Sequence, residues 1–396
     1  MNYNNIFKEG VSLLNNDKFA EAIEKFNSID PEVPNEVKHI LYYNIGISYK
    51  GLREKENALK FLYKSCDLKS DYDLPRIGLF EVYTLFGDWF NGFKFYDWNY
   101  VTDTMFHYEY NVSKNKRLDW EDPNTQIPLN IRFKKDYKHI QHVSDEELSE
   151  IYINSLNKVK NKVIHIISTQ GLGDVVQCSY YINELVKLNP KRIIFSVRPE
   201  LYRLIANTFK YTNLIEIRMT KLHDDEYDYF IPSFNLIKLF KGDNTPKKPW
   251  LKISLYDFEY FKNKLKLGNK KIIGINWKGN PLHHNDKKRS MELEEMITRA
   301  PEGKLVSLQF NPTEEDKKLF KKYDILDLSS NYNDCYEMAI IMLLCDEIHT
   351  VDSAPAHISA GIGRKTYCYI PKGFEDYRWG ISGDCFNYEK IKLVRL

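Results

Sequence analysis

The sequence predicts an α plus α/β protein, with helical hairpins at the N-terminus followed by two lobes that each contain a parallel sheet. Gly10 and Gly46 are 36 positions apart, as are Ala22 and Ala58, which indicates a repeated helical unit. From residue 158 onward, short apolar runs alternate with helix-like stretches, as in proteins whose parallel strands are joined by crossover helices. A break near 242–269, which opens with Gly242, Pro246 and Pro249, divides this second part in two.

Composition agrees with a folded chain of two or three domains. The 396 residues are 43% hydrophobic and 28% charged, which excludes a mainly disordered protein. The net charge of +2 does not indicate nucleic-acid binding, although a local cluster such as 287–289 can still act on an anion.

The cysteines and the N-terminus indicate where the protein works. None of the six cysteines forms a Cys-x-x-Cys pair or has metal-ligand spacing with His, so we expect reduced, buried thiols and no metal site. The N-terminal stretch MNYNNIFKEG lacks the apolar region of a secretion signal, and no window approaches about 18 apolar residues. We therefore expect a cytoplasmic protein without membrane insertion.

Residues 1–100 are predicted to form the helical hairpins. Each unit pairs small with large apolar residues at helical spacing, and these are Gly10, Ala22 and Phe26, then Gly46, Ala58 and Leu62, then Tyr83, Gly92 and Tyr96. The pattern resembles the tetratricopeptide repeat, whose period is about 34 residues. Such hairpins either bind an acceptor or partner on a concave surface, or only stabilise the protein or join two copies in a homodimer.

Residues 101–157 differ from both neighbours and are predicted to be a linker with an insertion. Pro123 and Pro128 interrupt any helix, whereas 144–147 is typical of a helix start. His139 and His142 have no carboxylate or Cys partner in sequence, and we assign them no role.

The two α/β lobes are predicted at 158–250 and 251–396, with a cleft between them. The predicted strands are 163–167, 193–197, 229–231, 272–277, 305–308, 325–328, 348–351 and 366–370. The clearest helices are predicted at 177–188 and 335–345. Ligands of such folds bind where the carboxyl ends of strands meet helix N-termini, so the loops at these points are the candidate sites.

The first candidate loop follows the strand at 163–167. Its Gly171 and Gly173 let a ligand approach the backbone, and Asp174 is expected in the first turn of the following helix, which we expect to begin near Val175. The Asp174 carboxylate either takes a proton from a hydroxyl group or only caps the helix.

The second candidate loop follows the strand at 272–277. It contains three cations near its end and several polar groups, and the candidate ligands are Lys278, Asn280, Lys287, Lys288, Arg289 and Ser290. These cations either neutralise a diphosphate or belong to a solvated basic loop.

The third candidate loop follows the strand at 348–351. Asp352 can accept hydrogen bonds from sugar hydroxyls, while Ser353 and the next backbone N–H groups can bind phosphate. Pro355 is suited to a first helical turn. The alternative is an ordinary helix cap.

Together these stretches resemble a known family. They are QGLGDVVQ at 170–177, GINWKGNPLHHNDKKRS at 274–290, LVSLQF at 305–310, VDSAPAHISAGIGR at 351–364 and DYRW at 376–379. The chain resembles bacterial tetratricopeptide-repeat proteins with a glycosyltransferase domain, which are related to the ADP-heptose:lipopolysaccharide heptosyltransferases and more distantly to the O-GlcNAc transferases. The resemblance covers the repeats and nearly all of 158–380.

The resemblance implies a two-Rossmann-lobe fold of the GT-B type, a nucleotide-sugar donor, inversion at the anomeric carbon, and no cofactor or catalytic metal. The family's proposed base falls on Asp174, its phosphate-binding Lys falls on Lys288 or, in an equally close register, Lys287, and its donor-sugar Asp falls on Asp352. Ser353 and His357 match the same motif. The family's Lys-x-Trp-Pro continuation is absent at 289–291, which speaks against heptose as the donor sugar.

The sequence leaves the acceptor open. A protein side chain, a cell-surface glycan and a hydroxylated base in DNA are all compatible with it. The rival to an enzyme is a non-catalytic repeat scaffold whose transferase fold no longer turns over, because a fold does not guarantee an activity.

Overall fold

The computed structural model describes residues 3–69, 72, 74–96, 120–122, 127–128, 153, 155–219, 224–240, 248–283, 286–371, 376–381 and 388–396. The described residues divide into two compact units. The first comprises those up to Ser155 together with 376–381, and the second comprises the remainder of the chain from Leu156. Of the predicted linker, the structure describes the short antiparallel pair β1 (Trp120–Asp122) and β2 (Ile127–Pro128) and a few residues near its end.

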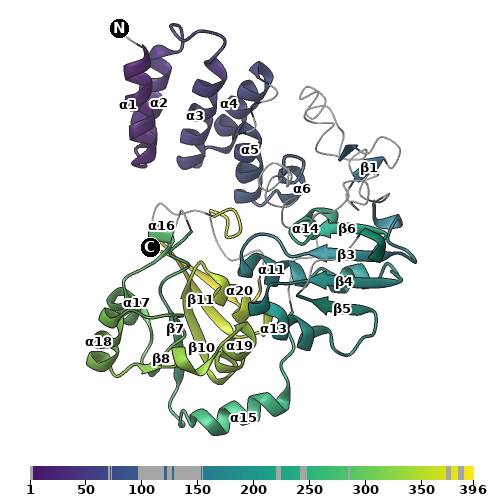
Figure 1. Ribbon diagram of the computed structural model, residues 1–396. Coiled ribbons are helices and arrows are strands. Elements are labelled where there is room, and N and C mark those ends of the chain that lie inside the picture. The colour runs from purple at the N-terminus through teal and green to yellow at the C-terminus, as the bar shows by residue number, and fades with distance from the viewer. Residues whose placement is uncertain are drawn as a thin grey trace. The chain divides into compact units, whose positions relative to one another are not determined.

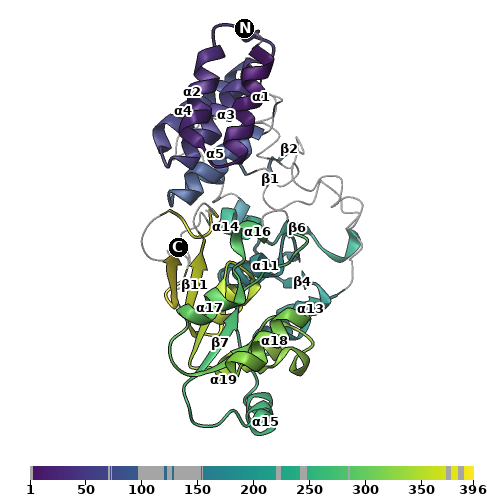
Figure 2. The same cartoon turned by 90° about the vertical axis from the view of Figure 1, so that its left-hand side faces the viewer.

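The first unit contains the helical hairpins. Its helices are α1 (Tyr3–Asn15), α2 (Phe19–Ile29), α3 (Lys38–Gly51), α4 (Lys55–Leu68), α5 (Leu74–Leu85) and the short α6 (Trp89–Gly92). They follow one another as antiparallel pairs, and Figure 2 shows α1 to α5 side by side. Turns separate the paired helices, since α1 ends at Asn15 and α3 ends at Gly51.

The small residues of the repeat act where two helices of a hairpin meet. A β-carbon built on Gly10 would lie 2.5 Å from Cε1 of Phe26, and one built on Gly46 would lie 2.7 Å from Cγ of Leu62. Glycine therefore allows α1 to pack against α2 and α3 against α4 at close range. The ring of Phe26 is fully buried by this contact.

A segment from near the C-terminus belongs to this helical unit. The ring of Tyr377 packs edge-on against Phe80 of α5, with 5.1 Å between ring centroids, and against Trp89 of α6 at 6.1 Å. The Arg378 guanidinium lies over the Tyr377 ring, and Arg378 pairs with Asp376 at 2.7 Å. The third hairpin is thus completed by residues about 290 positions away in sequence.

The second unit begins with a four-stranded parallel sheet in the order β5-β4-β3-β6 (Figure 1). Its strands are β3 (Val163–Ile167), β4 (Arg192–Ser196), β5 (Ile215–Arg218) and β6 (Tyr229–Pro232). The segments between and after them contain α11 (Leu172–Ser179), α12 (Ile182–Val186), α13 (Pro199–Phe209), the 3-10 turn η2 (Asp224–Glu226) and α14 (Asn235–Leu239).

Two expectations for this lobe were wrong in detail. The predicted helix 177–188 is two helices, because the backbone N–H of Tyr181 bonds the carbonyl of Cys178 three residues back and interrupts the α-helical pattern. The first of them begins at Leu172, three residues before the start expected near Val175, so that Gly173 lies inside the helix.

The second lobe has a six-stranded parallel sheet in the order β12-β11-β10-β7-β8-β9. Its strands are β7 (Ile272–Asn276), β8 (Lys304–Ser307), β9 (Leu326–Asp327), β10 (Glu347–Val351), β11 (Lys365–Ile370) and β12 (Ile391–Arg395). Numbered within the lobe this is the order 3-2-1-4-5-6, the doubly wound order of dinucleotide-binding folds. The predicted strands are confirmed, whereas β5 and β12 were not predicted.

Helices cover both faces of this sheet, with α17 and α18 on one side and α19 and α20 on the other (Figure 1). The helices of this lobe are α15 (Leu255–Leu265), α16 (Asp286–Arg289), α17 (Leu293–Arg299), α18 (Glu314–Tyr323), α19 (Cys335–Leu344) and α20 (Ala354–Gly361), with the 3-10 turn η3 (Ser329–Asn331). The core beneath α17 and α18 includes Trp277 and Met296, both fully buried. The predicted α plus α/β class is therefore confirmed.

Candidate functional site

The order of the strands in each sheet indicates where a ligand would bind. In each sheet the first strand in sequence, β3 or β7, lies in the interior, and the strand order reverses beside it. Ligands of doubly wound sheets bind at this switch point, at the carboxyl ends of the strands. The three predicted loops follow β3, β7 and β10 and so lie at the switch points, with the β7 and β10 loops adjacent to each other.

The loop after β3 is held to the end of the neighbouring strand β6. The backbone N–H of Thr169 donates to Oγ of Ser233 at 3.1 Å, and the N–H of Ser233 donates to the carbonyl of Ile167. Gln170 then adopts a left-handed conformation with φ 67°, which turns the chain into α11.

Asp174 lies in the first turn of α11, as predicted. Its Oδ2 accepts a hydrogen bond from the backbone N–H of Gly171 at 2.9 Å, and its residue exposure is 9%. The helix-capping interaction expected as the alternative is therefore present, and it fixes the position of the carboxylate at the N-terminal end of the helix.

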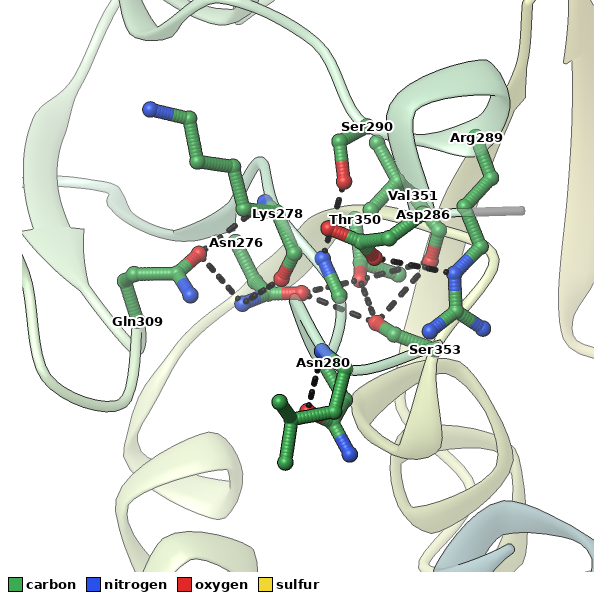
Figure 3. A network of polar contacts seen from close by, with 12 residues as sticks. Asn276, Lys278, Asn280, Asp286, Arg289, Ser290, Gln309, Thr350, Val351 and Ser353 are labelled. Atoms are coloured by element: carbon green, nitrogen blue, oxygen red, sulfur yellow. Dashed lines mark hydrogen bonds and ion pairs between the residues drawn. The ribbon is translucent and has the colours of Figure 1, made fainter. Parts of the chain in front are cut away.

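A buried polar network joins the ends of β7 and β10 (Figure 3). Asn276 and Thr350 are partners in the two neighbouring strands. Oδ1 of Asn276 accepts hydrogen bonds from Thr350 at 3.1 Å and from Ser353 at 2.9 Å. The network therefore fixes Ser353, one of the predicted phosphate-binding residues, to the strand beside it.

Gln309, just after β8, extends this network to the loop after β7. Its Oε1 accepts hydrogen bonds from Nδ2 of Asn276 at 2.8 Å and from the backbone N–H groups of Trp277 at 3.3 Å and Lys278 at 3.0 Å. Sequence reasoning missed Asn276 and Gln309 as site residues. A usable signal was present, because each is an amide at the end of an apolar strand.

The loop from Lys278 to Ser290 closes on itself. Oγ of Ser290 accepts a hydrogen bond from the backbone N–H of Gly279 at 3.1 Å, and Oδ1 of Asn280 accepts from the N–H of Leu282 at 3.0 Å. Arg289 packs over Gly279, since a β-carbon built there would lie 2.5 Å from one guanidinium nitrogen. The side chains of Ser290 and Asn280 thus hold the loop through hydrogen bonds to its backbone N–H groups.

The predicted cations divide into two kinds. Arg289 donates to Asp286 at 3.1 Å, and Nζ of Lys278 lies 3.9 Å from Oδ1 of Asp316, on the far side of the network from Ser353 in Figure 3. Lys287 and Lys288 are both exposed on α16. Because both lysines are exposed, their exposure does not identify which of them is the phosphate ligand.

Ser353 immediately precedes α20, whose first turn contains Pro355 as predicted. The Ser353 hydroxyl makes no capping hydrogen bond to this helix and instead donates to Asn276. The side-chain cap expected as the alternative is therefore absent at Ser353, while Asp352 is 5% exposed and His357 is 3% exposed.

The structure brings the first and third loops together. A β-carbon built on Gly173 of α11 would lie 2.6 Å from Cδ2 of His357 and 3.3 Å from Cα of Ala354, both on α20. The N-terminal turns of the two helices are therefore in contact across the two lobes. Asp174 follows Gly173 and Ser353 precedes Ala354, so both predicted residues flank this contact.

The described residues contain neither a metal-binding cluster nor a membrane-spanning helix. No group of three or more His, Cys, Asp or Glu side chains among them is arranged to hold a metal ion. In the same part of the chain, no helix has the length and apolar character needed to cross a membrane.

Comparison with known proteins gives distant structural likenesses. No protein-family model matches the chain, and no curated protein matches it in sequence. Among solved structures, it is similar to a glycosyl transferase family 9 protein from Veillonella parvula, with 12% identity, TM-score 0.43, and coverage of 60% of this chain and 87% of the other. The ADP-heptose lps heptosyltransferase II of E. coli gives 13% identity, TM-score 0.39, and coverage of 59% and 90%. LpoA of Haemophilus influenzae gives 8% identity, TM-score 0.25, and coverage of 92% and 67%. Likenesses of this degree do not establish an activity.

Proposed function

We propose that the chain is an inverting glycosyltransferase of the GT-B type that uses a nucleotide-sugar donor and no catalytic metal. The observation that carries this proposal is the contact of α11 with α20 through Gly173 and His357. This contact joins the switch points of the two parallel-sheet lobes. One lobe supplies the carboxylate of Asp174, and the other supplies the N-terminal end of α20, a type of position that often binds phosphate. The motif resemblance of 274–290 and 351–364 supports the same function.

The second lobe is the proposed donor side. Because the Ser353 hydroxyl does not cap α20, the diphosphate of the donor is placed at the N-terminal end of this helix, where the helix dipole favours an anion. Pro355 has no N–H and the N–H of Ala356 donates to the carbonyl of Ser353 at 3.0 Å, so the backbone donor proposed for the anion is the N–H of Ala354.

Lys288 or Lys287 supplies positive charge at the neighbouring loop, and Arg289 supports that loop. Lys278 belongs to the same loop, but its Nζ lies 3.9 Å from Oδ1 of Asp316 and away from Ser353. Asp352 then accepts hydrogen bonds from hydroxyls of the donor sugar.

Asp174 is the proposed base on the other side. It takes the proton of an acceptor hydroxyl while the hydroxyl oxygen forms a bond to the anomeric carbon. The bond from that carbon to the diphosphate oxygen breaks, and its electron pair leaves with the nucleoside diphosphate. Attack from the face opposite the leaving group inverts the anomeric configuration.

The acceptor is a hydroxyl of a protein side chain, of a cell-surface glycan or of a modified DNA base. The helical unit favours a protein acceptor, if its hairpins are tetratricopeptide repeats that bind a peptide segment. The residues at 289–291 speak against heptose as the donor sugar. The second candidate function is a non-catalytic scaffold, in which the same hairpins bind a partner and no sugar is transferred.

A thermal-shift screen tests the proposal. The full chain is melted with UDP, GDP, ADP, TDP, CMP and their common sugar conjugates at millimolar concentration. A ligand that binds only the folded state raises the melting temperature, because it adds to the free energy of unfolding. At a ligand concentration of 100 times the dissociation constant this addition is about 2.7 kcal/mol. A shift with one nucleotide series supports a donor site and identifies its base. No shift with any of them, together with no hydrolysis of the sugar conjugates, favours the scaffold.

A further inference from the structure

A buried tyrosine, Tyr388, contacts His357, the residue of α20 that packs against Gly173 of α11. Its hydroxyl lies 2.6 Å from Nδ1 of His357, and both residues are 3% exposed. Tyr388 precedes β12 and lies well outside the three predicted loops. Its hydrogen bond to His357 connects it to the site.

His357 transmits this contact to the other lobe. Its ring edge, Cδ2 and Nε2, faces Gly173 of α11 at distances that leave no room for a β-carbon. The hydrogen bond of Nδ1 to Tyr388 fixes the rotation of the imidazole about its side-chain bonds. The ring therefore has one orientation in which its edge supports the first turn of α11.

Trp250 holds the opposite ends of the same two helices. Its indole stacks on the Tyr388 ring with 6.1 Å between centroids and 6° between planes, and its Nε1 donates to Oγ of Ser179 at 2.9 Å. Ser179 is the last residue of α11. The backbone N–H groups of Trp250 and Leu251 donate to the carbonyl of Gly361, the last residue of α20, at 3.0 Å each.

These contacts form a closed circuit from α11 through His357, Tyr388 and Trp250 back to α11. We propose that Tyr388 is a positioning residue that sets the placement of Asp174 against the Ser353 end of α20. The inference rests on the proposed function, in which these two residues act on the same donor and acceptor. A displacement of about 1 Å of reacting groups can cost about 100-fold in rate, so a removed support should be visible in turnover.

Tyr388→Phe tests the proposal because it removes one hydroxyl and keeps the ring stack on Trp250. The matched control is Tyr369→Phe. Tyr369 lies in the same lobe and is equally buried, and its hydroxyl lies 2.8 Å from Nδ1 of His349. The Tyr369 hydroxyl also donates to the carbonyl of Arg299 at 3.3 Å, so this control loses a backbone hydrogen bond as well as the one to its His partner. Both variants lose a buried His–Tyr hydrogen bond, but among these two pairs only His357 faces α11.

The expected result is a fall in kcat of about tenfold for Tyr388→Phe, with the KM for the donor changed less than twofold. Tyr369→Phe should keep both constants within twofold of the wild type. Unchanged kcat in Tyr388→Phe, or an equal loss in Tyr369→Phe, would overturn the positioning role.

Amide hydrogen exchange of peptides that cover α11 provides a readout without turnover. Exchange should be several-fold faster in Tyr388→Phe than in the wild type, and unchanged in Tyr369→Phe. Equal exchange in all three proteins overturns the inference even if the enzyme is active. If the wild type transfers no sugar, the proposed function fails separately, and the exchange comparison still decides whether Tyr388 holds α11 in place.

Discussion

The side-chain oxygen of Gln309 accepts a hydrogen bond from the backbone N–H of Lys278 at 3.0 Å, and this bond ties the loop after β8 to the loop after β7. The same oxygen accepts from Trp277 and from Asn276, and Gln309 is only 7% exposed. Three donors at the candidate site thus share one buried acceptor, and of these the amide of Asn276 also donates to the carbonyl of Lys278 at 3.3 Å.

Gln309→Met should therefore affect both stability and ligand binding. Methionine has a similar shape but no oxygen, so the donors that it leaves buried and unpaired should lower the free energy of unfolding by about 1–3 kcal/mol. The loop that carries Lys278 should also loosen and bind nucleoside diphosphate more weakly. Urea unfolding and calorimetric titration measure the two effects. A variant as stable as the wild type would mean that the Gln309 oxygen contributes nothing to the stability of the fold.

Asp174 has a structural role and a proposed chemical one, which two substitutions separate. Asp174→Asn keeps an oxygen that can accept the N–H of Gly171, so stability and donor affinity should stay close to the wild type. Turnover should fall by about 100-fold or more, because an amide cannot take the acceptor proton. Asp174→Ala should show the same loss of turnover and a further loss of about 1 kcal/mol from the missing cap.

Steady-state kinetics and thermal melting distinguish these outcomes. If Asp174→Asn keeps full turnover, Asp174 is a helix cap and the base lies elsewhere. If both variants lose stability equally, the amide does not replace the carboxylate in the cap, and the kinetic loss alone does not assign the base.

Much of this fold could be predicted from sequence, because central parallel strands are buried on both faces and appear as continuous apolar runs. The run at 272–277 is one example, and it matches β7 within a residue. The edge strands β5 and β12 escaped this criterion. They read IEIR and IKLVR, in which Glu216 and Lys392 interrupt the apolar positions, as expected where one face or edge meets water.

The site was predicted in its parts but not in its connections. Asp174 and Ser353 stand beside glycine and helix-start signals that are local in sequence. The contact of Gly173 with His357 joins residues 184 positions apart, and no local pattern encodes such a distance. Gln309 was overlooked although it is an amide just after an apolar strand, because its three donors, from the end of β7 and the loop after it, are about 30 positions away in sequence.

Lys287 and Lys288 can be told apart by substituting each in turn. Both are exposed on α16, so neither Lys287→Ala nor Lys288→Ala should change the melting temperature of the free protein appreciably. The lysine that contacts the diphosphate should weaken its binding by about tenfold when removed, a loss of about 1.4 kcal/mol. The family resemblance places this role on Lys288 or, in an equally close register, on Lys287.

Calorimetric titration with the nucleoside diphosphate, repeated at higher salt, gives the answer. The contact lysine should also account for part of the salt dependence of binding, because a direct ion pair is screened by salt. Equal, small effects of both substitutions would mean that α16 is a solvated basic segment and that the diphosphate is held elsewhere.

Glu347, at the start of β10, should make stability depend on pH in the acid range. Its side chain accepts hydrogen bonds from His349 at 3.2 Å and Lys365 at 3.3 Å, and pairs with Lys271 at 3.1 Å. Burial acts to raise the pKa of Glu347, but the bonds from His349, Lys271 and Lys365 together lower this pKa below its ordinary value. The folded state therefore favours the ionised carboxylate more than the unfolded state does.

A lowered pKa means that this stabilisation is complete above the ordinary glutamate value near 4.5 and is lost as the pH falls through the lower value of the folded protein. Glu347→Gln should thus be less stable than the wild type at pH 7, by about 1.5–3 kcal/mol, because the bonds it removes involve charged groups. The difference should shrink between pH 5 and about pH 3. Urea unfolding of both proteins across this range measures it. A difference that stays constant down to pH 3 would mean that Glu347 acts through its shape and neutral hydrogen bonds, and that its charge contributes nothing to the stability of β10.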